Sequence, residues 1–311
     1  MNTRKLNLSP KDIRIISEQL NSSESLRLEP FIECDDHTVS RETFSLFREA
    51  DLDLLVTQPQ PSVERLPDYY ESEDYISHTD SKRNLTEKLY QIVKNHSLKR
   101  KLKLINQVSE GKGKLLDVGC GTGDFLKKCQ LGGWFVSGVE PNQKARSLAE
   151  SKIGATNCHS SIEELLNLDR DTFDVISMWH VLEHIPDLYV YLTKIKTLLR
   201  SNGCLIVAVP NFNSYDAQHY GTYWAGYDVP RHLWHFSRTS IERIFSNLDM
   251  VVVEELPLYF DSFYVSMLSE KYKHGKQNYA SAFYRGLRSN WKARMTGEYS
   301  SLIYLIRQAN T

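Results

Sequence analysis

Apolar residues in the second half of the chain follow two patterns, short continuous runs and helical stripes. The runs "KLLDVGC", "FVSGVE", "FDVISMW" and "GCLIVAVPN" begin at positions 114, 135, 173 and 203. Short apolar runs bounded by polar turns predict strands that are buried on both faces. The segments between them carry apolar residues at every third or fourth position, which predicts helices. Strands that alternate with helices indicate a parallel, doubly wound sheet.

The helical spacing is found in five segments. The predicted helices are 82–108, 124–131, 141–154, 187–200 and 239–248. The helix over 141–154 has Pro141 at its start and Gly154 at its end, an asymmetry typical of helices. "MVVVEEL" and the C-terminal "SSLIYLIRQ" predict two further strands.

The N-terminal part of the chain differs from the rest. Residues 1–60 are acidic and without regular apolar spacing, so we expect an irregular module, which ends in the extended "TQPQPS". The chain therefore divides into an N-terminal module with a lid over 1–80 and an α/β domain over 81–311. Within this domain, the aromatic-rich segment 211–236 follows the fifth strand as a long loop, and such loops tend to be functional.

Composition excludes several classes of protein. Hydrophobic residues make up 41% and charged residues 25%, which is typical of soluble globular proteins. There is no apolar run long enough to span a membrane, and the N-terminus lacks the apolar core of a signal peptide. The five cysteines form no CxxC pair. We therefore expect a cytoplasmic protein with reduced thiols.

Charge is segregated along the chain, although the net charge is only −1. Residues 1–80 hold 17 acidic and 8 basic side chains, residues 82–114 hold 2 and 10, and residues 270–311 hold 2 and 8. Such runs are usually solvated helix faces. The alternative is that the basic segments attract an anionic substrate to the site.

The stretch "LLDVGCGTGDFL" places Gly119, Gly121 and Gly123 directly after a predicted strand. In a doubly wound sheet, ligands bind beyond the carboxyl ends of the strands. Glycines there allow positive φ and a close approach of the ligand to the main chain. The dinucleotide fingerprint GxGxxG needs a glycine where this chain has Asp124, and an acid at a helix start disfavours a pyrophosphate. A nicotinamide oxidoreductase is therefore disfavoured.

Three motifs occur in order: "LLDVGCGTGDFL", "VSGVEPN" and "FDVISMWHVLEHIPD". On these motifs, residues 85–260 resemble the class I S-adenosylmethionine-dependent methyltransferases. They are most similar to the small-molecule branch that includes the ubiquinone-biosynthesis O-methyltransferases. The resemblance implies a Rossmann-like, mostly parallel sheet of seven strands with an antiparallel C-terminal strand. It also implies S-adenosyl-L-methionine as the cofactor and methyl transfer as the activity.

The resemblance further implies roles for individual residues. Asp117 orders the glycine loop and neighbours the amino group of the cofactor, and Glu140 accepts the ribose hydroxyls. Ser161 and Ile162 flank the adenine. The complete set implied for the cofactor is Asp117, Gly119, Cys120, Gly121, Gly123, Glu140, Pro141, Ser161, Ile162, Trp179 and His180 at the sulfonium end, and Tyr75 as a lid contact. Glu183 and His184 in "VLEH" are interpreted as structural residues.

The flanks carry a narrower resemblance. "LPDYYESEDYISH", "DVPRHLWHFS" and "GEYSSLIYLIRQ" resemble a bacterial methyltransferase group of unassigned substrate, whose members often begin with a zinc ribbon built on two cysteine pairs. This chain has Glu49 and Leu52 where one pair would fall, and only Cys34 upstream. Because structural zinc needs four ligands, we interpret the N-terminal module as a metal-free remnant. It is expected to pack against the catalytic domain or a partner.

The segment 211–236 is the expected acceptor side. Histidine can accept a proton from a hydroxyl or amine near neutral pH, so His232 is the candidate general base, with His235 beside it. Arg231 could orient an anionic acceptor through paired hydrogen bonds. A structural role for each histidine is an open alternative. The spacing of His232 and His235 does not favour metal binding, and no metal is expected.

The predicted activity is methyl transfer to a small-molecule acceptor, with a hydroxyl of an anionic, sugar-type or lipid-type metabolite as the favoured target. An RNA or protein methyltransferase and a non-catalytic cofactor-binding or scaffold protein are the alternatives. The signature of amino-adenine methyltransferases is absent, since "SMWHVLEH" stands at its position. Nucleic acid is therefore a disfavoured partner, and the sequence does not define an oligomeric state.

Overall fold

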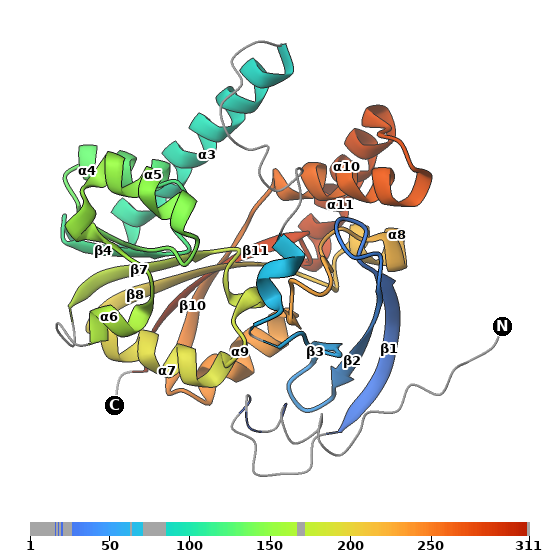
Figure 1. Ribbon diagram of the computed structural model, residues 1–311, viewed down its shortest axis with the longest axis horizontal. Helices are drawn as coiled ribbons and strands as arrows, with labels where there is room; N and C mark the ends of the chain where they lie inside the picture. Colours follow the sequence, from blue (N-terminus) through green and yellow to red (C-terminus); the bar gives the residue numbers. More distant parts are fainter. Residues whose placement is uncertain are drawn as a thin grey trace.

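A seven-stranded sheet crosses the larger part of the molecule (Figure 1). The computed structural model describes residues 27–62, 64–70, 85–166 and 172–309, together with Ile16, Glu18 and Leu20. The strand order is β10-β11-β8-β7-β4-β5-β6. The strands are β4 (Lys114–Val118), β5 (Phe135–Val139), β6 (Cys158–His159), β7 (Phe173–Trp179), β8 (Leu199–Pro210), β10 (Met250–Pro257) and β11 (Ser301–Gln308).

Strand direction places the ligand-binding edge. β4, β5, β6, β7 and β8 run parallel, and β11 is antiparallel to both of its neighbours, β8 and β10. From β4 the chain first builds β5 and β6 on one side, and then returns to build β7 and β8 on the other. This reversal creates a switch point at the carboxyl ends of β4 and β7. The predicted doubly wound sheet with an antiparallel C-terminal strand is confirmed.

Helices cover both faces of the sheet, because successive strand residues point to opposite sides. Leu115 and Val175 pack with α3, α4 and α5, whereas Leu116 and Ile176 pack with α6, α7 and α9. Figure 1 shows these two sets of helices above and below the sheet. The helices are α3 (Leu85–Val108), α4 (Asp124–Leu131), α5 (Gln143–Ile153), α6 (Ile162–Leu166), α7 (Leu188–Leu198) and α9 (Arg238–Ser246).

The N-terminal module is a sheet, and the prediction of an irregular module was wrong. β1 (Leu28–Asp35), β2 (Thr43–Glu49) and β3 (Leu54–Gln58) form an antiparallel meander, which β9 (Trp234–His235) completes. Its acidic residues lie mainly in turns and at exposed strand positions. The alternation of apolar and polar residues within each strand is therefore too short to predict a strand. β3 connects the two parts, because Leu54 and Val56 join the core of the large sheet and Leu55 joins the core of the module.

Glu49 and Leu52 stand where the zinc-ribbon proteins have a cysteine pair, and here they bond to each other. The buried Glu49 carboxylate accepts a hydrogen bond from the backbone N–H of Leu52, with a distance of 2.6 Å between Oε2 and N. Cys34 is buried in the apolar core of the module. The interpretation of the module as a metal-free remnant stays a prediction.

The segment 211–236 is ordered structure and not a long loop. It contains α8 (Tyr215–Tyr220), a 3₁₀ turn (Gly221–Tyr223) and β9. Its side chains Trp224 and Tyr227 are buried in the core of the N-terminal module. The two predicted parts of the chain therefore share both a sheet and a core.

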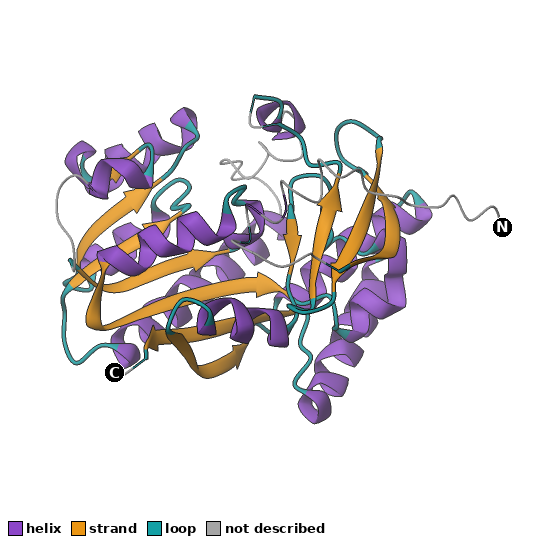
Figure 2. Cartoon of the chain, turned by 90° about the horizontal axis from the view of Figure 1, so that it is seen from below, coloured by secondary structure: helices purple, strands orange, loops and turns teal. Residues whose placement is uncertain are grey.

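Two helices between β10 and β11 had no predicted counterpart. α10 (Asp261–His274) and α11 (Tyr279–Thr296) form an antiparallel hairpin, which lies beside the N-terminal sheet in Figure 2. They approach closely because small side chains meet at their contact. A Cβ atom on Gly286 would lie only 2.7 Å from the ring of Phe263.

A buried ion cluster fastens the N-terminal module to the segment 211–236. Arg231 is 1% exposed, and its Nη2 donates to Asp36 Oδ1 at 3.0 Å and to Asp228 Oδ1 at 2.7 Å. Its Nη1 donates to the backbone carbonyl of Tyr69 at 3.0 Å. The expected role of Arg231 in orienting an anionic acceptor is not compatible with this placement, because all three guanidinium nitrogens are engaged within the protein.

We predict that Arg231→Met lowers the free energy of unfolding by about 3–5 kcal/mol, because it leaves the Asp36 and Asp228 carboxylates buried without their cation. Urea denaturation of the purified variant measures this change. Arg48→Met is the matched control, since Arg48 forms an exposed ion pair with Asp53 and such pairs contribute at most about 1 kcal/mol. An equal decrease in the free energy of unfolding of the two variants would show that the buried cluster stabilises the fold no more than an exposed ion pair does.

Candidate functional site

The glycine loop follows β4 at the switch point. Gly119, Gly121 and Gly123 all have positive φ, between +54° and +77°. A Cβ atom would lie 2.4 Å from Val181 at Gly119 and 2.8 Å from the backbone of Ala149 at Gly123. These two glycines therefore allow close packing within the protein. At Gly121 a Cβ atom would meet nothing within 4 Å, so this glycine borders open space that a ligand can fill.

Glu140 stands beside this loop, at the end of β5. Its Oε2 accepts a hydrogen bond from the Gly121 N–H at 2.9 Å, and its Oε1 accepts one from the Asn142 N–H at 2.9 Å. The carboxylate thus fixes the turn of the glycine loop and the start of the next helix. A carboxylate in this position can also accept hydroxyl protons from a diol above the loop.

Asp117 lies beneath the loop, on β4. It is buried and accepts a hydrogen bond from Ser177 Oγ at 2.6 Å. Burial raises the pKa of Asp117 to about 7, although the Ser177 hydrogen bond and the nearby Lys101 cation act in the opposite direction. Lys101 of α3 also lies 4.2 Å above the ring of Trp179. Sequence reasoning missed Lys101, since it was one of many cations in a basic helix.

Trp179 and His180 follow the end of β7. Trp179 Nε1 is buried and has no hydrogen-bond partner among the described residues. The His180 ring lies between two carboxylates, 3.3 Å from Glu183 and 2.8 Å from Asp261. Burial alone would lower the pKa of His180, but these carboxylates raise it to about 10. Because a protonated ring repels a sulfonium cation, we interpret His180 as an anchor for α10.

The remaining expected cofactor residues are arranged around the same edge. Cys120 packs beneath the loop, where a Cβ atom on Gly138 would lie 2.6 Å from its Sγ. Pro141 is exposed at the start of the next segment, and Ser161 precedes α6. Ile162 is 1% exposed and belongs to the main core, which favours an indirect role. Tyr75 lies outside the described residues.

Glu183, His184 and His232 come together near the loop, since Gly119 packs against Val181, two residues before Glu183. His184 Nδ1 lies 3.0 Å from the carbonyl of Arg231, and His232 Nδ1 lies 2.9 Å from the carbonyl of Gly226. Because a carbonyl can only accept, each Nδ1 carries the hydrogen and each Nε2 presents a lone pair. One potential ligand atom from each of the three residues lies within 4.8 Å of the others.

The surroundings of this cluster set the protonation states of Glu183 and His184. Burial and the neighbouring His232 lower the pKa of His184 to about 4, so His184 is neutral at physiological pH. Glu183 is 1% exposed and lies 3.3 Å from the His180 ring, but neither oxygen accepts a well-formed hydrogen bond from the described residues. Burial would raise the pKa of Glu183, and the surrounding histidines lower it below its usual value. Glu183 is therefore a carboxylate.

Sequence reasoning treated Glu183 and His184 as structural and did not join them to His232. The two motifs "VLEH" and "PRHLWH" contain all three residues, but nothing in the sequence pairs them. Two imidazoles and a carboxylate could also hold a divalent cation. This is the one such set among the described residues, whereas the sequence predicts no metal.

His235, the second expected catalytic histidine, is placed elsewhere. Its Nε2 lies 2.9 Å from Thr57 Oγ1, and its backbone pairs with Leu55 in the N-terminal sheet. Burial and the nearby His232 keep its pKa well below the ordinary value. His235 is therefore a buried structural residue, and a catalytic role does not fit this placement.

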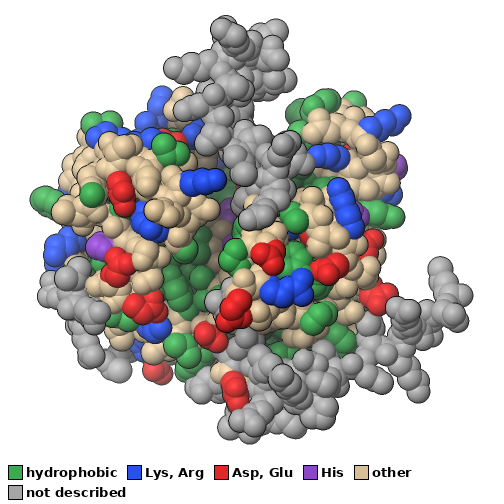
Figure 3. All heavy atoms as spheres, viewed as in Figure 1, with side chains coloured by type: hydrophobic (Ala, Val, Ile, Leu, Met, Phe, Trp, Pro, Cys, Tyr) green, Lys and Arg blue, Asp and Glu red, His purple; other side chains and the backbone are tan. Residues whose placement is uncertain are grey.

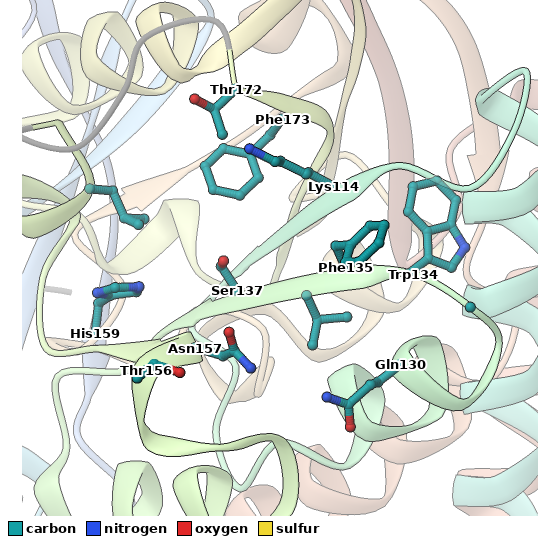
Figure 4. A pocket seen from close by; sticks show the side chains of 13 residues that line it. Lys114, Gln130, Trp134, Phe135, Ser137, Thr156, Asn157, His159, Thr172 and Phe173 are labelled. Carbon is teal, nitrogen blue, oxygen red and sulfur yellow. The ribbon is translucent and has the colours of Figure 1, made fainter.

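A cavity of about 640 Å³ lies elsewhere in the structure, not at this edge. Lys114, Phe135 and Phe173, which begin β4, β5 and β7, line it together with His159 and Asn157 (Figure 4). Because ligands of doubly wound sheets bind at the carboxyl ends of strands, this cavity is not the candidate site. No predicted site residue lines it.

Comparison with known proteins identifies the family. Residues 89–255 match the family described as a methyltransferase domain. The match covers more than half of the chain, so the chain belongs to this family. This confirms the predicted membership in the class I S-adenosylmethionine-dependent methyltransferases, with S-adenosylmethionine as the cofactor of the class. The glycine loop, Glu140 and Glu183 all lie within the matched segment.

Individual relatives agree with this assignment. A ubiquinone biosynthesis O-methyltransferase of Rhodopseudomonas palustris (strain HaA2) is 28% identical over 159 residues, 48% of this chain and 62% of the relative. One of Coxiella burnetii (strain Dugway 5J108-111) is 32% identical over 118 residues, 36% of this chain and 50% of the relative. The chain therefore spans less than two thirds of the length of these curated relatives.

A solved structure shows the same fold. Magnesium protoporphyrin IX methyltransferase (ChlM) from Synechocystis PCC 6803, with bound SAH, has a TM-score of 0.50 and 12% identity. The alignment covers 78% of this chain and 97% of that one. Within the described residues, no helix combines the length and apolar character needed to cross a membrane.

The residues at the carboxyl edge fit S-adenosylmethionine. The open space at Gly121 can take the ligand, and the adjacent Glu140 carboxylate can accept its ribose hydroxyls. The buried carboxyl of Asp117 lies beneath the loop, where it can pair with an amino group.

We predict that Glu140→Ala weakens the binding of S-adenosylmethionine by about 1.5–3 kcal/mol, because a charged acceptor of two hydroxyls is lost. Gly121→Val should abolish binding, because its branched side chain fills the open space above the loop. Isothermal titration calorimetry measures both effects.

Matched controls separate these effects from strain. Gly275→Val places the same side chain at a glycine that also has positive φ and an open environment, at the end of α10. Glu150→Ala removes a carboxylate from α5, near but not at the loop. Unchanged affinity in Glu140→Ala, or equal losses in the two valine variants, would contradict the assigned cofactor site.

Proposed function

We propose that this protein transfers the methyl group of S-adenosylmethionine to a hydroxyl of a small-molecule acceptor. The observation that carries the proposal is the pairing of two parts at one edge of the sheet. The glycine loop with Glu140 is one part, and the cluster of Glu183, His184 and His232 is the other. The two parts touch, because Gly119 packs directly under Val181, two residues before Glu183.

The bound cofactor supplies a methyl group that is already activated on a sulfonium. The protein must therefore hold an acceptor in line with it and keep water away. Correct alignment can contribute on the order of 7–11 kcal/mol to lowering the barrier. The burial of the cluster supports such exclusion of water, since Glu183 and His232 are both buried.

His232 is the proposed general base. Its Nδ1–H is held by the Gly226 carbonyl, which fixes the ring and leaves the lone pair on Nε2 to accept a hydroxyl proton. The imidazolium that forms faces two carboxylates, Glu183 within the cluster and Asp228, whose Oδ2 lies 3.9 Å from Nε2. These negative charges favour the protonated ring in the transition state.

The acceptor is proposed to be a hydroxyl-bearing, sugar-type or lipid-type metabolite. The O-methyltransferase relatives support a hydroxyl as the target. Arg231, the residue expected to bind an anionic acceptor, is buried in the ion cluster, so a negative charge on the acceptor is not part of the proposal. A screen of hydroxylated acceptors with labelled S-adenosylmethionine, followed by product mass, tests the activity. Absence of transfer to every acceptor, with intact cofactor binding, would favour a scaffold role.

We predict that cofactor binding releases a proton from Asp117. The pKa of Asp117 is raised to about 7, and a cationic amino group beside it favours the charged form. Affinity should therefore rise with pH below about 7 and level off above it. Calorimetry at pH 6.5 in two buffers of different ionisation enthalpy measures the released proton.

The control for this experiment is Asp124→Asn. Asp124 pairs with Lys94 and Lys152, and despite partial burial these lysines lower its pKa, so it is ionised throughout this range. The variant should keep the pH dependence, whereas Asp117→Asn should remove it. If the affinity of the wild-type protein for S-adenosylmethionine did not change between pH 5.5 and 8, the proposed role of Asp117 would be refuted.

We predict that His232→Ala leaves cofactor affinity nearly unchanged but lowers turnover on the order of a hundred-fold to ten-thousand-fold, as expected for a lost general base. The loss should shrink as pH rises, because the acceptor then ionises without help. Turnover against pH, measured once an acceptor is found, provides the test.

His219→Ala is the matched control, because His219 belongs to the same segment but stacks on Tyr215 outside the cluster. Adding a chelator tests whether the cluster holds a metal ion instead, and we expect turnover to be unchanged by the chelator. Equal turnover of wild type and His232→Ala would remove His232 from catalysis. Inactivation by the chelator that added zinc restores would instead assign the cluster to a metal ion.

A further inference from the structure

Helix α11 exposes large apolar side chains, of which Phe283 also contacts the Phe263 ring of α10. Its buried face consists of Ala282, Gly286, Ser289 and Ala293. The exposed residues include Trp291 at 63% and Met295 at 84%. The complete exposed set on α11 is Tyr279, Phe283, Tyr284, Leu287, Trp291 and Met295. Five of these six residues follow one another at every fourth position, so they form one stripe about 24 Å long.

Cations border this stripe, and acids are absent from it. Residues 271–297 contain seven lysine and arginine residues and no aspartate or glutamate. Arg285 lies over the ring of Tyr284, and Arg288 and Lys292 lie over the ring of Tyr215. These contacts hold positive charge along one side of the stripe. The partner of this face must therefore be both apolar and anionic.

The basic helix α3 extends this surface. Its Arg100 lies over the ring of Tyr259, and its His96 packs edge-on against Phe260, both just before α10. Tyr259 and Phe260 are themselves exposed. The basic helix α3 thus contacts the residues that lead into α10. In Figure 3, hydrophobic and basic side chains share the surface of the α10–α11 hairpin, at the upper right.

We propose that the α10–α11 hairpin docks this protein on anionic lipid bilayers. An exposed arc of aromatic and aliphatic residues bordered by lysine and arginine is the pattern of a helix that lies in the plane of a membrane interface. Tyrosine and tryptophan favour this region because their rings have an apolar body and a polar tip. A symmetric contact between two copies would place the same seven cations against each other.

The docking surface is connected to the catalytic edge. Asp261, the first residue of α10, pairs with His180 beside the cofactor loop. A membrane on the hairpin would therefore lie close to the acceptor side, where a lipid-type acceptor could enter. Docking itself does not require methyl transfer, so vesicle binding and activity can fail independently.

The test uses the full-length protein and sedimentation with vesicles of phosphatidylcholine alone or with one quarter phosphatidylglycerol. We expect at least tenfold stronger binding to the anionic vesicles, and loss of this difference in 0.5 M salt. The triple variant Phe283→Ser, Leu287→Ser, Trp291→Ser should bind at least tenfold more weakly. Its three side chains are all exposed, and Phe283 contacts only the edge of the hairpin core through Phe263, so the cofactor affinity should be unchanged.

The matched control is the double variant Leu131→Ser, Phe135→Ser. These residues are 78% and 73% exposed, on α4 and β5, and their replacement should leave vesicle binding intact. Absence of binding to anionic vesicles, or equal loss in both variants, would overturn the proposal. Two further outcomes would overturn it, provided that the triple variant still binds vesicles. One is a dimer in light scattering that the triple substitution abolishes, and the other is RNA binding in a filter assay that it abolishes.

Discussion

The buried cluster of Asp36, Arg231 and Asp228 is the constraint on which the rest of the site depends. Charges this deeply buried persist only when they neutralise one another and every polar atom is bonded. The cluster joins the end of β1 to the segment that precedes β9. It also fixes the Arg231 carbonyl, which orients His184, and the neighbouring His232. A structural ion pair therefore sets the geometry of the chemical groups beside it.

The same edge of the sheet holds histidines of opposite character. His180 lies between Glu183 and Asp261, which raise its pKa to about 10, whereas burial and His232 lower the pKa of His184 to about 4. One ring is thus a cation that anchors α10, and the other is a neutral group beside the candidate base. The different environments of the two rings therefore give them different structural roles at one edge of the sheet.

The α10–α11 hairpin carries a surface that is separate from the glycine loop. It lies between the antiparallel strands β10 and β11, outside the matched segment 89–255. The hairpin interrupts neither the parallel strands nor the glycine loop. Its first residue, Asp261, pairs with His180, so the start of the hairpin contacts the edge of the sheet that holds the candidate site.

The sequence by itself determined the large sheet, its helices and the glycine loop, because apolar runs and glycine spacing are local signals. It did not reveal the N-terminal sheet, since its fourth strand has only two residues and comes from position 234. Nor did it reveal α11, whose buried face is made of alanine, glycine and serine while its large apolar residues face outward. Only the tertiary structure brought His232 to Glu183 and engaged Arg231, because those contacts join segments that no local pattern connects.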